Sequence, residues 1–314
     1  MIISLAILIG GFFILVVGAE ALVRGSSALA LRLGVTPLLI GLTIVAFGTS
    51  SPELVVSIKA SLGGNGAIAL GNVIGSNIAN IALILGITAL ISPITITTQV
   101  IRQEIPIMII VSVLLWLLLW DGTLERWEGA ILFCGILFYL GFSYFSARGE
   151  NNPDLAKEFA EGVPKVKGKA WVAVALVTVG LSMLIGGGKL FVDGAIALAE
   201  FFGISQAIIG LTIVAVGTSM PELATSVMAA IKKEGDLAVG NVVGSNIFNI
   251  LGILGIAALV HPLLSQDFSS VDFGVMIATA VVLLPLAWTG MKLERWEGAL
   301  LLAGYLLYLF YLIQ

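Results

Sequence analysis

Long apolar stretches separated by short polar ones recur along almost the whole chain. Each stretch holds about 20 residues with few charges, which is the length that an α-helix needs to cross roughly 30 Å of hydrocarbon. The pattern therefore predicts membrane-spanning helices and not a barrel. Ten spans are predicted, over residues 2–23, 36–60, 67–91, 104–120, 125–146, 169–192, 205–231, 237–260, 271–289 and 295–313.

Composition places the chain in a bilayer. Of its 314 residues, 59% are hydrophobic and 11% are charged, which is too little charge for the surface of a water-soluble protein of this size. We expect an all-α integral membrane protein. The first apolar stretch lacks the basic n-region of a signal peptide and matches a later segment, so we expect it to stay in the fold. The single cysteine, Cys134, excludes a disulfide framework, and the single histidine, His261, argues against a zinc site or a Ser/His/Asp triad.

The two halves of the chain repeat each other at an offset of 169 residues, with no gap. A duplication of this length predicts two copies of one structural unit. The aligned segments are GLTIVAFGTSSPEL at 41–54 with GLTIVAVGTSMPEL at 210–223, which share 12 of 14 residues, GNVIGSN at 71–77 with GNVVGSN at 240–246, and LERWEGA at both 124–130 and 293–299.

Each half holds five predicted spans, an odd number, so the second half starts on the opposite side of the membrane. We therefore expect two inverted five-helix repeats. The first covers 1–146, with its motif region at 41–91, and the second covers 169–314, with its motif region at 210–260. The polar segment between them, at 147–168, reads as a linker without EF-hand spacing.

The basic residues predict the orientation of the chain. With both termini outside and the linker in the cytoplasm, twelve lysines and arginines lie at cytoplasmic ends of the spans and three lie outside, which agrees with the positive-inside rule. The three outside are Lys59, Arg126 and Lys189. We expect a multi-pass protein of the cell (inner) membrane.

Candidate chemistry lies in the middle of the second and seventh spans, where each carries a proline followed by a glutamate. Proline lacks an N–H and displaces the carbonyl one turn earlier, so Pro52 and Pro221 predict broken helices with free carbonyl groups. Hydroxyl groups lie on the same turns. An ionised glutamate in a bilayer costs on the order of 3 kcal/mol, so a cation is expected beside Glu53 and Glu222. Candidate oxygen donors are Thr49, Ser50, Glu53, Thr218, Ser219 and Glu222.

The GNVxGSN segments add polar side chains at a spacing of four, which places them along one helix face. Ser76, Asn80, Ser245 and Asn249 are expected to take part directly in the site. The remaining asparagines are expected to hold helices together. These are Asn72, Asn77, Asn241 and Asn246.

Other polar residues are interpreted as structural. The two LERWEGA segments are expected at the membrane interface, with Trp127 and Trp296 at headgroup level and acidic residues near helix N-termini. The charged residues near the ends of the first and sixth spans are expected to snorkel toward water. They are Glu20, Arg24, Lys189 and Asp193.

With its paired GTSxPE and GNVxGSN elements, the whole chain resembles the prokaryotic sodium/calcium exchangers of the cation/calcium antiporter superfamily. The resemblance implies a core of helices 2, 3, 7 and 8, across which helices 1 and 6 slide. It implies Ca²⁺ ligation by Glu53, Glu222 and the carbonyl groups of Thr49 and Thr218. It implies Na⁺ ligation by the glutamates with Ala46, Ser50, Ser76, Ala215, Ser219 and Ser245. Asn80 and Asn249 take the remaining central positions, and some relatives carry Asp at the place of Asn249, which weakens any case here for potassium co-transport or for proton coupling at that position.

The function expected from these features is Na⁺/Ca²⁺ antiport by alternating access, with electrogenic Ca²⁺ efflux. Two ionised carboxylates reorient only when cations accompany them, which enforces exchange. Calcium/proton exchange on the same scaffold is the main alternative, and a calcium channel is a further one. An intramembrane enzyme is disfavoured because Ser50 and Ser51 lack a plausible base. No cofactor, nucleic acid or obligate protein partner is expected besides the two ions and the bilayer.

Overall fold

A computed structural model describes residues 2–64, 66–149, 170–201, 215–265 and 268–313. The protein is mostly helical, and several helices contain short π-helical segments. The helices of the first half are α1 (Ile2–Leu33), α2 (Pro37–Ile40), α3 (Ala46–Thr49), α4 (Ser51–Leu62), α5 (Gly66–Ile78), α6 (Gly86–Ile91), α7 (Ile105–Leu118) and α8 (Arg126–Gly149). Those of the second half are α10 (Ala170–Phe201), α12 (Ala215–Thr218), α13 (Met220–Ile231), α14 (Gly235–Phe248), α15 (Gly255–Val260), α16 (Ser270–Trp288) and α17 (Arg295–Ile313).

Seven helices of the described part are long and apolar enough to cross a membrane, or eight if one bent pair counts as a single span. They confirm a helical membrane protein, whereas the predicted count of ten stays a prediction. The seventh predicted span, 205–231, is described only from Ala215 onward, and the predicted linker at 147–168 lies almost entirely outside the described residues.

The first and sixth predicted spans end too early. Helix α1 continues to Leu33 and α10 continues to Phe201, about ten residues beyond the predicted ends. Glu20 therefore lies inside a helix and not near its end, as do Arg24, Lys189 and Asp193, so their predicted placement near helix ends was wrong, whereas snorkelling of these side chains stays a prediction. Glu20 instead forms ion pairs with Arg24 on the same helix and with Lys232 at 3.1 Å.

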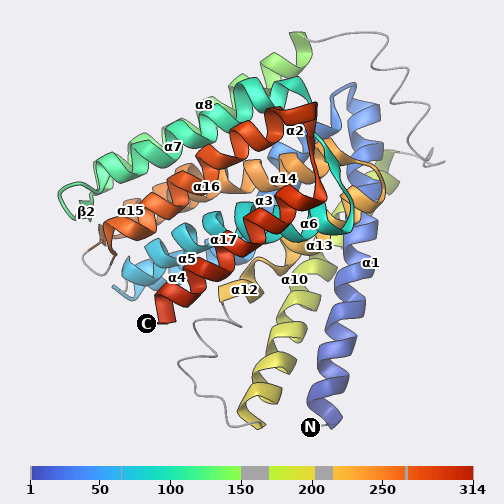
Figure 1. Cartoon of the computed structure of the whole chain (residues 1–314), viewed down its shortest axis with the longest axis horizontal. Coiled ribbons are helices and arrows are strands. Elements are labelled where there is room, and N and C mark those ends of the chain that lie inside the picture. Colours follow the sequence, from blue (N-terminus) through green and yellow to red (C-terminus); the bar gives the residue numbers. More distant parts are fainter. Residues whose placement is uncertain (1, 65, 150–169, 202–214, 266–267, 314) are drawn as a thin grey trace.

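Helices α1 and α10 lie side by side and project away from the rest of the molecule (Figure 1). Gly11, Gly18 and Gly25 recur every seven residues along α1, which is close to two turns. Gly180 and Gly187 provide the matching positions on α10, and a Cβ built at Gly180 would lie 2.6 Å from the backbone nitrogen of Leu22. The two backbones are therefore in direct contact, and glycine is required for this approach.

The most buried helices lie at the centre of the molecule. Every residue of α14 from Leu237 to Phe248 is buried, and the span formed by α5 and α6 is its counterpart in the first half. In each span a π-helical segment follows the GSN sequence, at Ala79–Leu85 and Asn249–Leu254. Such segments widen a helix locally and occur frequently at functional sites.

Four two-residue strands join the two halves. Strand β1 (Ile94–Thr95) pairs antiparallel with β4 (Lys292–Leu293), and β2 (Thr123–Leu124) pairs antiparallel with β3 (Leu263–Leu264). Adding the repeat offset of 169 to β1 gives β3, and adding it to β2 gives β4, so the two pairings are equivalent.

The LERWEGA segments form the N-termini of α8 and α17. The backbone N–H of Glu125 donates to the carboxylate of Glu128 at 2.8 Å, and that of Glu294 donates to Glu297 at 2.7 Å. These acidic residues thus cap helices, which confirms their structural role. Trp127 and Trp296 are exposed, as expected for interfacial side chains.

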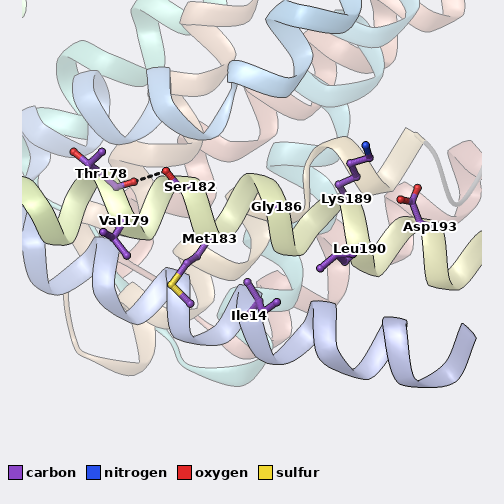
Figure 2. Close-up of a pocket in the computed structure, with 9 residues that line it drawn as sticks. All are labelled: Ile14, Thr178, Val179, Ser182, Met183, Gly186, Lys189, Leu190 and Asp193. Carbon is purple, nitrogen blue, oxygen red and sulfur yellow. Dashed lines mark hydrogen bonds between the residues drawn. The ribbon is translucent and has the colours of Figure 1, made fainter. Parts of the chain in front are cut away.

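Replacing Gly180 by valine is expected to destabilise the protein because the new side chain would overlap the backbone of α1. The free energy of unfolding is expected to fall by about 1–3 kcal/mol. Thermal unfolding of the purified protein in detergent measures this loss. Gly186→Val is the matched control, since Gly186 lies on the same helix in the groove of Figure 2 and a Cβ there meets nothing within 4 Å. Equal melting temperatures for both variants would contradict the close contact.

Candidate cation-binding site

Two broken helices bring the predicted glutamates into the interior. The helix formed by α2 and α3 meets α4 at a bend of 47°, and Ser50 occupies the break. Ser219 occupies the equivalent break between α12 and α13. Glu53 and Glu222 lie in the first turns of α4 and α13, where the positive end of the helix dipole favours a negative charge. The two predicted breaks are confirmed.

Each glutamate is held by the serine of the other broken helix. Ser219 Oγ donates to Glu53 Oε1 at 3.2 Å, and Ser50 Oγ donates to Glu222 Oε1 at 3.0 Å. Both carboxyl groups are buried, with 1% of each residue exposed. The second oxygen, Oε2, has no hydrogen-bond partner in either case within the described part of the chain. One oxygen of each carboxylate is therefore oriented by protein and the other is available.

The GSN segments contribute further buried oxygens. Asn80 Oδ1, Asn249 Oδ1 and Ser245 Oγ are buried and find no partner among the described residues. Ser76 is also buried, and its Oγ lies 3.5 Å from Ser219 Oγ. The four side chains that were predicted to take part directly thus all lie in the interior, and three of them carry an unpaired oxygen.

At the threonine and alanine candidates, the group predicted to bind an ion is the backbone carbonyl. Thr49 is fully buried, and its hydroxyl donates to Asn241 Oδ1 at 3.1 Å; the group predicted to take part is its carbonyl. Ala46 is fully buried, and its carbonyl accepts from the Ser50 N–H at 3.0 Å. Thr218 ends α12 and Ala215 begins it, at the equivalent positions of the second half.

The arrangement has the chemistry of a site for a hard cation. Among the candidate ligands, five buried side-chain oxygens find no partner within the described part of the chain, and two of them belong to the carboxylates of Glu53 and Glu222. Leaving buried polar atoms unpaired is costly, and a cation that accepts oxygen ligands removes that cost. Among the described residues, no group of three or more His, Cys, Asp or Glu side chains is placed to hold a metal ion, so the set of donors does not resemble a site for zinc or another soft metal.

Two asparagines brace the glutamate backbones. Asn72 Nδ2 donates to the Glu53 carbonyl at 3.1 Å and to Ser57 Oγ at 2.9 Å. Asn241 makes the same pair of contacts with Glu222 at 3.4 Å and Ser226 at 3.1 Å. Together with Asn77 and Asn246, they confirm the predicted packing role of these asparagines.

Sequence reasoning missed Ser57 and Ser226. Each follows its glutamate by four residues and therefore lies on the same helix face one turn later. The two positions also match at the repeat offset of 169, which is the signal that could have identified them.

Replacing Glu53 by glutamine is expected to raise the melting temperature of the protein when no cation is available. The substitution removes one of two carboxylates that are buried without a compensating charge, and functional sites commonly carry such instability. Thermal unfolding in choline buffer with a chelator at pH 8 tests this. Glu297→Ala is the control, because Glu297 caps a helix and the loss of its side-chain oxygens should lower the melting temperature. A lower melting temperature for Glu53→Gln would contradict the expectation.

Comparisons with known proteins identify the family. A family model described as "Sodium/calcium exchanger protein" matches residues 3–146 and 172–314. The chain is 38% identical over 318 residues to the inner membrane protein YrbG of Escherichia coli, covering 98% of this chain and 96% of that protein. It is 35% identical to the sodium/calcium exchanger MaX1 of Methanosarcina acetivorans, covering 98% and 97%. Among solved structures, the sodium-calcium exchanger NCX_Mj superposes with a TM-score of 0.84 at 32% identity, covering 98% of this chain and 97% of that one. The chain belongs to the sodium/calcium exchanger family and shares its membrane fold.

Proposed function

We propose that this protein is an antiporter that exchanges Na⁺ for Ca²⁺ across the cell (inner) membrane by alternating access. The observation that carries the proposal is the set of five buried candidate oxygens that find no partner among the described residues, two from the carboxylates of Glu53 and Glu222 and three from the GSN segments. Two relatives, MaX1 and NCX_Mj, are named as sodium/calcium exchangers.

The donors divide naturally between the two ions. Ca²⁺ takes 6 to 8 oxygens, for which the carboxylates and the carbonyl groups on the broken helices are suited. Na⁺ uses the glutamates and the hydroxyl and carbonyl oxygens beside them. We assign Glu53, Glu222, Thr49 and Thr218 to Ca²⁺, add Ala46, Ser50, Ser76, Ala215, Ser219 and Ser245 for Na⁺, and place Asn80 and Asn249 at the centre.

Reciprocal contacts support ten helices in two inverted repeats, with units at 1–146 and 169–314 and a cytoplasmic linker at 147–168. The hydrogen bonds to the two glutamates, the two strand pairings and the glycine contacts all occur twice at the offset of 169. Along α1, Gly11 meets Gly187 and Gly18 meets Gly180, so α1 and α10 run antiparallel. Two units related in this way begin on opposite sides of a membrane.

Charge compensation enforces exchange in this proposal. Two buried carboxylates without bound cations oppose any rearrangement that isolates them from water, so the empty protein rarely reorients. Helices α1 and α10, which project from the core, are the elements that move across it. Both termini lie outside, and Ca²⁺ leaves the cell as Na⁺ enters.

Glu53→Gln is expected to abolish uptake of radioactive Ca²⁺ into proteoliposomes loaded with Na⁺, because it removes one of the two central charges. Glu104→Gln is the matched control, since Glu104 is a fully buried carboxyl group that hydrogen-bonds Tyr139 at 2.8 Å and takes no part in the proposed site. Its uptake should remain within about twofold of the original.

Replacing internal Na⁺ by K⁺ or choline, with and without a pH gradient, tests the coupling ion. Uptake should require internal Na⁺. Uptake driven by a proton gradient without Na⁺ would assign the protein to calcium/proton exchange, and a flux indifferent to every counter-ion would refute antiport.

An inside-positive potential is expected to increase Ca²⁺ uptake into Na⁺-loaded vesicles. Exchange of three Na⁺ for one Ca²⁺, the ratio that the family resemblance implies, moves one positive charge outward per cycle. That charge is worth roughly 2.3 kcal/mol per 100 mV, which is about a fiftyfold change in the Ca²⁺ gradient at equilibrium. Valinomycin with K⁺ gradients of either direction sets the potential. An equilibrium gradient that ignores the potential would establish electroneutral exchange.

A further inference from the structure

Asn77 and Asn246 form a reciprocal pair between the two central spans. Asn77 Nδ2 donates to the backbone carbonyl of Asn246 at 3.2 Å, and Asn246 Nδ2 donates to the carbonyl of Asn77 at 3.2 Å. Both side chains are almost completely buried, with 1% of each residue exposed. These two bonds fix which end of each carboxamide is nitrogen and which is oxygen.

The fixed oxygens of this pair each hold a neighbour from the other half. Asn246 Oδ1 accepts from Asn80 Nδ2 at 2.9 Å, and Asn77 Oδ1 accepts from Asn249 Nδ2 at 3.0 Å. The side-chain nitrogens of Asn80 and Asn249 are therefore engaged in these hydrogen bonds. Their side-chain oxygens are buried and find no partner among the described residues. The orientation of these two carboxamides is thus imposed by a network that crosses between the repeats.

We propose that Asn77 and Asn246 are positioning residues, which turn the carboxamides of Asn249 and Asn80 so that oxygen and not nitrogen faces the cation. This inference rests on the proposed function, because it requires an ion between Glu53 and Glu222. An amide oxygen is a ligand for Ca²⁺ and Na⁺, whereas an amide N–H directed at a cation repels it. Neither Asn77 nor Asn246 touches the ion itself.

Each positioning residue orients a single asparagine, because Asn77 accepts from Asn249 and Asn246 accepts from Asn80. Loss of the Asn77 side chain leaves Asn249 without its acceptor and free to turn its carboxamide. Asn246 keeps its donated bond to the Asn77 carbonyl, which belongs to the backbone and survives the substitution. Asn246 therefore continues to orient Asn80, so the effect of replacing Asn77 passes through Asn249 alone.

A double-mutant cycle on the purified full-length protein tests this assignment, with the dissociation constant for Ca²⁺ measured by isothermal titration calorimetry in Na⁺-free buffer. Asn77→Leu, which preserves the shape of the side chain, is expected to weaken Ca²⁺ binding by roughly tenfold, as for the loss of one well-formed buried contact. In an Asn249→Ala background the same substitution should cause no further loss, since the group it orients is gone. In an Asn80→Ala background it should still cause the full loss, and this is the matched control.

Asn246→Leu should show the converse pattern, with its effect lost in Asn80→Ala and kept in Asn249→Ala. Asn77→Ser, which is too short to reach Asn249, serves as a second variant should the leucine substitution prevent folding, and gel filtration checks that each variant folds. Equal losses in all backgrounds would assign Asn77 a merely structural role and overturn the inference. Absence of Ca²⁺ binding by the unsubstituted protein would instead refute the proposed function.

Discussion

Two buried carboxylates, Glu53 and Glu222, that form no ion pair with any described residue set the main constraint on this structure. Ion pairs among the described residues lie elsewhere, between Glu20, Arg24 and Lys232 and between Lys292 and Glu294. The protein therefore orients Glu53 and Glu222 with hydroxyl groups and helix N-termini, which stabilise a negative charge without neutralising it. In the proposed function, the full positive charge beside these carboxylates is that of the transported ion.

Much of this arrangement could be predicted because the sequence is duplicated. A proline followed by glutamate in the middle of an apolar stretch indicates a broken helix, and its recurrence at an equivalent position identifies Glu53 and Glu222 as partners. The donors Ser50 and Ser219 also follow from the motif. What the motif could not show is that each serine bonds the glutamate of the other repeat, because a linear pattern contains no information on which helices meet.

The errors have physical causes as well. Hydropathy locates the apolar part of a helix and not its end, so Glu20 was assigned to a terminus although α1 continues to Leu33. An internal ion pair with Lys232 explains how the charge is accommodated there. The full roles of Asn77 and Asn246 could not be predicted from the sequence either. They were predicted to hold helices together, which they do, but the positioning role that we propose for them depends on hydrogen-bond directions that appear only in three dimensions.

The short strands carry a consequence for the origin of the molecule. Strand β1 pairs with β4 as β3 pairs with β2, so each repeat presents the same two edges to the other. An interface in which both partners use identical surfaces is isologous, and it closes upon itself without needing two different sequences. In the proposed inverted arrangement, two identical copies of one half would therefore suffice to build this assembly as a homodimer. Positions such as Glu20 and Lys189, which are equivalent at the offset of 169 and opposite in charge, lie outside these shared edges.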